Sequence, residues 1–284
     1  MTPIFALALS LPACAPSTTP AATDEDTGAN VDDDAGDSGS PDVGGWAHVG
    51  AAVMQTCGID VAGAVHCWGE ATGVDLGDAP AVPMVTIDAG GGDACGLDAA
   101  GEATCWGENR NGGLDRPPAG ALSALDVGSV GACALDADGE IACWGAPDDP
   151  LAEPPGGTFV DVAVGWVDWC AIERAGGIMC WGVNEYDAMS DLPEGPFAEL
   201  TVAGIHGCGL RPDGTIECWG FTYVGEPITS PAGEFSQVSA GNTHVCAIDS
   251  AGGLQCWGEK DWVQLDDVPA GSFVEVSAGG VHTC

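Results

Sequence analysis

Residues 235–258 read Phe-Ser-Gln-Val-Ser-Ala-Gly-Asn-Thr-His-Val-Cys-Ala-Ile-Asp-Ser-Ala-Gly-Gly-Leu-Gln-Cys-Trp-Gly. The first seven residues are typical of a short strand that ends at glycine, and Cys246–Asp249 and Leu254–Trp257 are typical of two further strands. Asp249 and Gly252 take the first and fourth positions of the turn between these two, as in a three-residue hairpin loop with a left-handed glycine. This stretch therefore predicts a short strand followed by a hairpin.

The same stretch recurs along residues 46–284. Cysteines recur every 38 residues, with one step of 37, and six of them have a partner ten residues on that opens a Cys-Trp-Gly triplet. The predicted pairs are Cys57 with Cys67, Cys95 with Cys105, Cys133 with Cys143, Cys170 with Cys180, Cys208 with Cys218, and Cys246 with Cys256. Bulky apolar residues begin the repeats, at Trp46, Met84, Leu122, Phe159, Phe197, Phe235 and Phe273. Seven such repeats predict an all-β, seven-bladed β-propeller with three to four short strands per blade, and a β-solenoid is the alternative.

The turn also fixes the register of each hairpin. If Asp60 faces Ala64 across the turn, Cys57 faces Cys67 at a non-hydrogen-bonded position, where Cα atoms approach to about 4.5 Å. Each pair can then form a disulfide, which is worth roughly 2.5–3 kcal/mol on the chain-entropy model. Zinc is the competing interpretation, but two ligands per repeat do not make a tetrahedral site. We expect disulfides, no metal and no cofactor.

Two cysteines lie outside this pattern. Cys284 lacks a partner ten residues on, so the sequence predicts a truncated chain with an incomplete last blade, open or poorly ordered, and an unpaired Cys284. Pairing between molecules is the alternative. Cys14 ends the stretch Leu11-Pro12-Ala13-Cys14 after an apolar run and resembles the lipidated cysteine of a bacterial lipobox. We expect residues 1–14 to be a signal peptide with lipidation at Cys14, and an ordinary cleaved signal is the alternative.

Acidic residues dominate the composition. The 284 residues include 43 Asp and Glu against 5 Lys and Arg, a formal net charge of −38, which argues against nucleic acid as a partner and favours a basic protein. Residues 15–45 predict a disordered acidic tether, because they cannot bury a core and lack the residue order of a calcium loop. We expect a monomer at the bacterial outer membrane or cell surface, in contact with the membrane only through its lipid. A secreted or periplasmic protein is the alternative.

The repeat resembles that of the regulator of chromosome condensation family. The spacing of an aliphatic residue, glycine, Cys-x-aliphatic, turn glycine and Cys-Trp-Gly is similar to the family repeat, and Trp106–Leu114 is similar to its Trp-Gly-x-Asn-x-x-Gly-Gln-Leu stretch. The cysteine-paired form is most similar to propeller-type β-lactamase-inhibitory proteins and plant crinkly-type ectodomains. The resemblance implies a propeller over residues 46–284. It implies no single function, because the family contains exchange factors, inhibitors and ectodomains.

Function is expected on the variable segments that follow each Cys-Trp-Gly, because equivalent loops of successive repeats gather on one rim. Tyr, Trp and Arg are the side chains that anchor interfaces, and the rim candidates are Tyr186, Tyr223, Trp262 and Arg110. Trp166, which with Trp169 interrupts the repeat near its histidine slot, is a further candidate, and the alternative for any of these aromatics is filling gaps between blades.

No catalytic constellation occurs in the sequence, and His206, His244 and His282 are interpreted as hydrogen-bonding spacers. The sequence therefore predicts a non-catalytic lipoprotein whose rim loops bind another protein. A carbohydrate-binding propeller and part of an enzyme whose site lies in missing C-terminal sequence are the alternatives.

Overall fold

The computed structural model describes residues 45–69, 79–109, 114, 116–145, 153–166, 168–184, 189–222, 225–259 and 268–284. The predicted signal peptide, Cys14 and nearly all of the predicted tether therefore lie outside the described residues. Over the described ranges the chain is all-β, with strands grouped into six three-stranded sheets. We number these sheets as blades one to six in chain order.

Each blade follows the chain from an inner to a middle to an outer strand. The strands are β1 (Trp46–Ala51), β2 (Gln55–Asp60) and β3 (Val65–Gly69); β4 (Thr86–Gly90), β5 (Asp93–Leu97) and β6 (Ala103–Gly107); β7 (Ser123–Val127), β8 (Ala132–Leu135) and β9 (Ile141–Trp144); β10 (Phe159–Val164), β11 (Asp168–Glu173) and β12 (Ile178–Gly182); β13 (Glu199–Ala203), β14 (His206–Leu210) and β15 (Ile216–Gly220); and β16 (Phe235–Ala240), β17 (His244–Asp249) and β18 (Leu254–Gly258).

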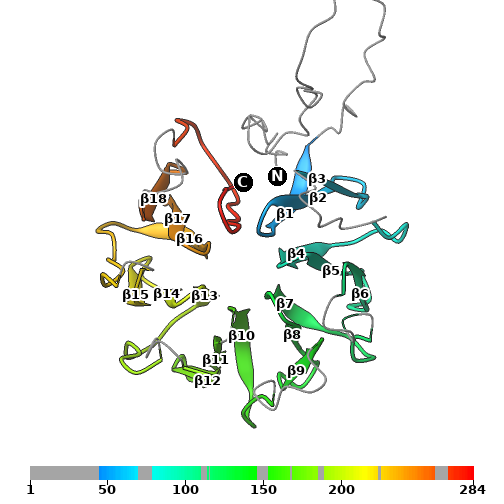
Figure 1. Cartoon of the computed structure of the whole chain (residues 1–284), viewed down its shortest axis with the longest axis horizontal. Helices are drawn as coiled ribbons and strands as arrows, with labels where there is room; N and C mark the ends of the chain where they lie inside the picture. Colours follow the sequence, from blue (N-terminus) through cyan, green and yellow to red (C-terminus); the bar gives the residue numbers. More distant parts are fainter. Residues whose placement is uncertain are drawn as a thin grey trace, which may run out of the picture.

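The six blades stand around a common axis as in a β-propeller (Figure 1), and residues 273–284 lie between blade six and blade one. We call these twelve residues the C-terminal segment. Its two halves are joined by a bridge between Ala278 and Thr283. Gln237 of blade six accepts a hydrogen bond from its main chain, and its Ser277 accepts one from blade one. The expectation that the last repeat is open is wrong, because the C-terminal segment contacts both neighbours.

Hairpin turns have the predicted chemistry and register. In blade one, β2 and β3 pair Ile59 with Val65 and Cys57 with Cys67. The Asp60 carboxylate accepts hydrogen bonds from main-chain N–H groups within the turn, at 2.8 and 3.0 Å. Gly63 has a φ of 87°, and the equivalent glycines of the other five blades have φ between 79° and 90°. The turn requires glycine there because other residues rarely adopt this left-handed conformation.

The structure joins the cysteine pairs that the register brings together. The six hairpin disulfides have Cα–Cα distances of 4.0–4.1 Å. The expectation that Cys284 is unpaired is wrong. Its sulfur is disulfide-bonded, and no described cysteine is free.

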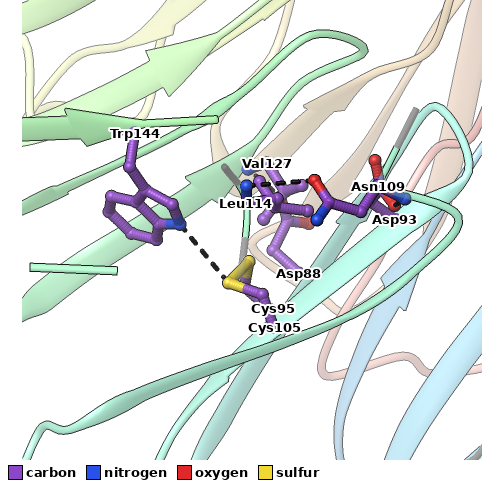
Figure 2. The surroundings of a disulfide bond; sticks show 8 residues. All are labelled: Asp88, Asp93, Cys95, Cys105, Asn109, Leu114, Val127 and Trp144. Carbon is purple, nitrogen blue, oxygen red and sulfur yellow. Dashed lines mark hydrogen bonds between the residues drawn. A yellow bond between two sulfur atoms is a disulfide. The ribbon is translucent and has the colours of Figure 1, made fainter. Parts of the chain in front are cut away.

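The hydrophobic core lies between blades rather than within them. The largest side chain in the cluster between blades two and three is Trp144 of β9, which packs with Cys95, Leu122 and Val127. Figure 2 shows its indole N–H directed at Cys105 Sγ of the preceding blade, at 3.4 Å. Trp106, Trp181, Trp219 and Trp257 take part in the corresponding clusters between other blades. These Cys-Trp-Gly tryptophans therefore fill inter-blade gaps.

Candidate binding surface at the mouth of the central channel

Each blade has two kinds of connection, at opposite ends of its strands. The hairpin turn between middle and outer strands lies at one end. At the other end, the pairing of Asp168 with Gly182 places the start of a variable segment beside the loop between inner and middle strands. His206 with Gly220 and His244 with Gly258 repeat this arrangement. The variable segments and the inner-to-middle loops therefore share one face, which we call the loop face, and the hairpin turns form the hairpin face.

Side chains of the loop face hold two variable segments at their bases. In blade two, Asp93 Oδ1 accepts a hydrogen bond from Asn109 N at 2.7 Å, and Asn109 Oδ1 accepts one from Leu114 N at 3.1 Å. Figure 2 shows this chain of contacts beside the disulfide. Asp168, Asn184 and Met189 repeat it in blade four, at 2.8 and 2.9 Å. The segments between these anchors therefore begin and end at fixed points.

Most of the predicted contact residues cannot be placed. Arg110, Tyr186, Tyr223 and Trp262 lie outside the described residues, so their role stays a prediction. Trp166 is described, and it lies on the loop face between β10 and β11 with 45% of its surface exposed. The histidine slot of this repeat is filled by Asp168, not by either tryptophan, as the pairing with Gly182 shows. Trp169 is 4% exposed and contacts Trp181, so it belongs to the core.

A cavity opens on the axis of the ring at the ends of the inner strands. The cavity has a volume of about 100 Å³. Each repeat contributes one loop residue to its rim, and we call this set the collar: Val53, Gly91, Ser129, Trp166, Gly204, Asn242 and Gly280. Trp166 is the only aromatic side chain among the described residues that line this cavity.

A second set of residues, which the sequence interpretation missed, joins neighbouring inner strands. The inner strand is the edge of its sheet, so the N–H groups on its free edge lack partners within the sheet. Side chains of the preceding repeat accept hydrogen bonds from them: Asp88 from Val127 N at 2.6 Å, and Glu199 from Val238 N at 3.0 Å. Glu275 instead contacts the His48 side chain of blade one. We call these side chains, with Glu275, the belt: Asp88, Asp126, Asp161, Glu199, Thr201, Gln237, Ser239, Glu275 and Ser277. Their recurrence two or four residues after the bulky residue of repeats two to seven was the available signal.

Belt carboxyls have unusual proton affinities. Burial raises the pKa of Asp88 and of Asp161 to about 6, and that of Glu199 to about 7. Burial, and then the negative charges of Asp88 and Asp161, raise the pKa of Asp126 well above its usual range. A hydrogen bond joins the carboxyl groups of Asp126 and Asp88, and both residues line the axial cavity. The structure thus brings together a carboxyl pair that the sequence had not indicated.

Buried histidines lie between the last blades. Burial lowers the pKa of His206 and of His244 to about 4, so both rings are neutral near pH 7. His244 Nε2 lies 2.7 Å from the Thr283 hydroxyl of the C-terminal segment, and His282 Nε2 lies 2.8 Å from the Thr56 hydroxyl of blade one. His244 and His282 therefore serve as the hydrogen-bonding spacers that the sequence predicts.

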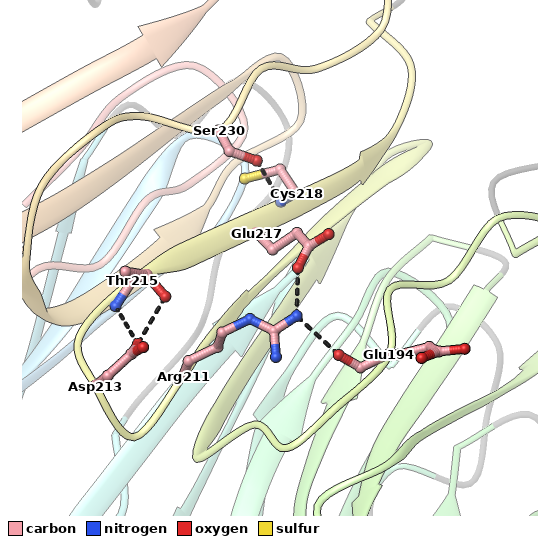
Figure 3. A network of polar contacts seen from close by, with 7 residues as sticks. All are labelled: Glu194, Arg211, Asp213, Thr215, Glu217, Cys218 and Ser230. Atoms are coloured by element: carbon pink, nitrogen blue, oxygen red, sulfur yellow. Dashed lines mark hydrogen bonds and ion pairs between the residues drawn. The ribbon is translucent and has the colours of Figure 1, made fainter.

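One of the few basic side chains is used on the hairpin face. Arg211 begins the hairpin turn of blade five, donates to the Glu194 carbonyl at 2.7 Å and pairs with Glu217 (Figure 3). Its guanidinium carbon also lies 4.3 Å from the centre of the Phe197 ring. The charge of Arg211 is therefore balanced locally and does not offset the carboxyls of the belt.

Two other features are absent from the described ranges. No three His, Cys, Asp or Glu side chains there are grouped as metal ligands would be. No helix in this part of the chain is long and apolar enough to span a membrane.

Comparison with known proteins supports the class of protein that this architecture defines. Residues 235–259 match the family described as "Regulator of chromosome condensation (RCC1) repeat". The chain is thus a β-propeller, and one of its repeats matches the family that the sequence resemblance indicates. No curated protein matches the chain.

Solved structures with the same fold come from plants and yeast. The ectodomain of the receptor kinase CR4 from Physcomitrella patens is 25% identical, with a TM-score of 0.68 over 81% of this chain and 67% of that chain. The CRINKLY ectodomain of the Arabidopsis thaliana receptor kinase ACR4 is 20% identical, with a TM-score of 0.66 over 84% and 90%. Prp20p from Saccharomyces cerevisiae, described with its binding to Gsp1p and histones, is 16% identical, with a TM-score of 0.66 over 83% and 80%.

Proposed function

We propose that this chain is a non-catalytic propeller that binds another protein through its loop face. The observation that carries the proposal is Trp166, an aromatic side chain that is 45% exposed on the face where the variable segments gather. Exposed aromatic side chains among variable loops on a rigid scaffold are typical of protein interfaces. The similarity to receptor ectodomains and to Prp20p, which binds proteins, supports the proposal.

The charge of the chain favours a basic partner. A net charge of −38 creates a negative potential that speeds association with basic proteins and weakens as salt is added. The same charge disfavours nucleic acid. We therefore propose a monomer that recognises a basic protein surface.

The proposed location is the bacterial outer membrane or cell surface. Six disulfides are typical of a protein that folds outside the cytosol. A lipid on Cys14 and residues 15–45 as a tether would hold the propeller outside the membrane. Mass spectrometry of the protein from its native membrane tests this, because the sulfur of Cys14 cannot carry both a lipid and a disulfide. A diacylglyceryl group on Cys14 supports the anchor, and Cys14 recovered in a disulfide overturns it.

The binding face is tested by site-specific photo-crosslinking in the full chain. One variant carries the photoreactive residue at Asn242 in the collar, and a matched control carries it at Val85, which is 60% exposed on the hairpin face. We expect a discrete cross-linked protein from cell-envelope extract at position 242, with a lower yield at high salt, and none at position 85. Cross-links from position 85 alone would show that the loop face is not the binding surface.

Two other assays separate the alternatives. Saturable binding on a glycan array that is lost in Trp262→Ala would replace the protein partner with a carbohydrate. Turnover by a longer chain would favour an enzyme with a site beyond residue 284.

A further inference from the structure

Trp166 is the only aromatic residue of the collar. Glycine stands at the position of Trp166 in three other repeats, as Gly91, Gly204 and Gly280. The fold therefore does not require a large side chain there. Trp166 nevertheless keeps 45% of its surface exposed beside the axial cavity. Tryptophan is one of the side chains that most often anchor protein interfaces, so Trp166 is a candidate for contact with a partner.

The size of the cavity limits what can enter it. Pockets for small-molecule ligands usually have volumes of about 300–1,000 Å³. The space of about 100 Å³ at the channel mouth is well below this range. It holds roughly seven to ten waters, at 10–15 Å³ for each. One long side chain at the tip of a protein loop fits such a space, whereas a nucleotide or a sugar chain does not.

The charges around the cavity favour the entry of a positively charged side chain. Asp88 and Asp126 both line it, and no Lys, Arg or His is among the described residues that do so. The other charged or titratable groups that act on this pair are Asp161, which faces Asp126, and His48, which faces Asp88. A cation in the mouth would therefore lie near carboxyls and beside the face of an indole, which attracts cations.

We infer that the channel mouth receives the tip of a partner loop that carries an arginine or a lysine, with Trp166 against the cation and the Asp88–Asp126 pair beneath it. This inference rests on the proposed function and specifies its partner. Entry of the cation favours ionisation of the carboxyl pair.

Calorimetry with synthetic hairpin peptides tests the inference on the full chain. The probes are disulfide-closed twelve-residue hairpins with arginine or lysine at the tip and a matched hairpin with citrulline, which has nearly the shape of arginine without its charge. At pH 7.5 we expect the arginine or lysine hairpin to bind at least tenfold more tightly than the citrulline hairpin.

Variants separate this site from general charge attraction. Trp166→Ala and Asp126→Asn should each weaken binding of the cationic hairpins at least fivefold. Val85→Ala on the hairpin face should leave this affinity unchanged, and unfolding midpoints of all variants check that they fold. Equal affinity for the arginine, lysine and citrulline hairpins, or no effect of Trp166→Ala, would overturn the inference. If the collar cross-linker at Asn242 still captures a protein in that case, the proposed function stands and only the cationic tip is wrong.

Discussion

Glu199 offers a direct test of how the belt carboxyls affect stability. Its carboxyl accepts a hydrogen bond from Val238 N at 3.0 Å, and burial raises its pKa from 4.5 to about 7. In the next repeat Gln237 does the same for Val276 N, at 2.8 Å. An amide therefore makes this contact without carrying a charge. Glu199→Gln should keep the hydrogen bond and remove the cost of holding a charge at this buried position.

The magnitude follows from the two pKa values. A carboxyl whose pKa is raised in the folded state contributes stability at low pH, and this contribution is lost as pH rises through the folded pKa. The difference between 4.5 and about 7 corresponds to about 3 kcal/mol at pH 8 and to less than about 0.5 kcal/mol at pH 4.5. Glu199→Gln should therefore raise the free energy of unfolding by up to about 3 kcal/mol at pH 8. It should change this quantity little at pH 4.5.

Urea unfolding followed by tryptophan fluorescence at both pH values measures this effect. Glu226→Gln is the matched control, because Glu226 is exposed in the same repeat and should show no difference between the two pH values. Gln237→Glu is the reverse change and should destabilise the protein at pH 8 only. If Glu199→Gln lowers stability equally at both pH values, the carboxylate makes a favourable contact that the amide cannot replace, and the reasoning is refuted.

Three further predictions concern a close backbone contact, a disulfide and an ion pair. Gly241→Ala would place a Cβ 2.2 Å from the Gly279 carbonyl oxygen, so thermal unfolding should show a loss of more than about 2 kcal/mol; Gly156→Ala, which meets nothing within 4 Å, should not. Replacing Cys95 and Cys105 together by alanine should cost about 2–3 kcal/mol in urea unfolding, and no loss would mean that this hairpin is already rigid without its disulfide. Glu275→Gln removes the partner that raises the His48 pKa. Since that contribution is present below pH 6.5 and is lost as pH rises above it, the variant should lose about 1 kcal/mol at pH 5.5 and little at pH 9.

Local features of the fold could be predicted because they are encoded within one repeat. The Asp and Gly of each turn fix the hairpin register, and the register brings Cys57 to Cys67. The position of Trp144 against the neighbouring disulfide is less local, but the repeat places an equivalent tryptophan in every complete blade. Because the pattern repeats, the sequence of one repeat also predicts how a tryptophan packs between neighbouring blades.

Contacts between repeats were harder to predict. Asp88 and Asp126 are 38 residues apart in sequence, and their contact arises only when two inner strands lie side by side at the axis. The pairing of Cys284 was also missed, because the ten-residue spacing identifies only partners within one hairpin. Trp166 was recognised as a departure from the repeat, but its place on the rim of the cavity depends on the arrangement of all the repeats.

The belt explains how a segment of only twelve residues completes the ring. The ring closes when inner-strand N–H groups on both sides of the C-terminal segment find hydrogen-bond acceptors. Gln237 and Ser239 accept from Val276 N and Ala278 N on one side. On the other side Ser277 accepts from Ala51 N, Glu275 pairs with His48, and Gly280 N donates to the Ala52 carbonyl. All these groups belong to the inner strand or to the loop that follows it. An outer strand is therefore not needed for closure, and the collar is formed by all seven repeats although only six blades have three strands.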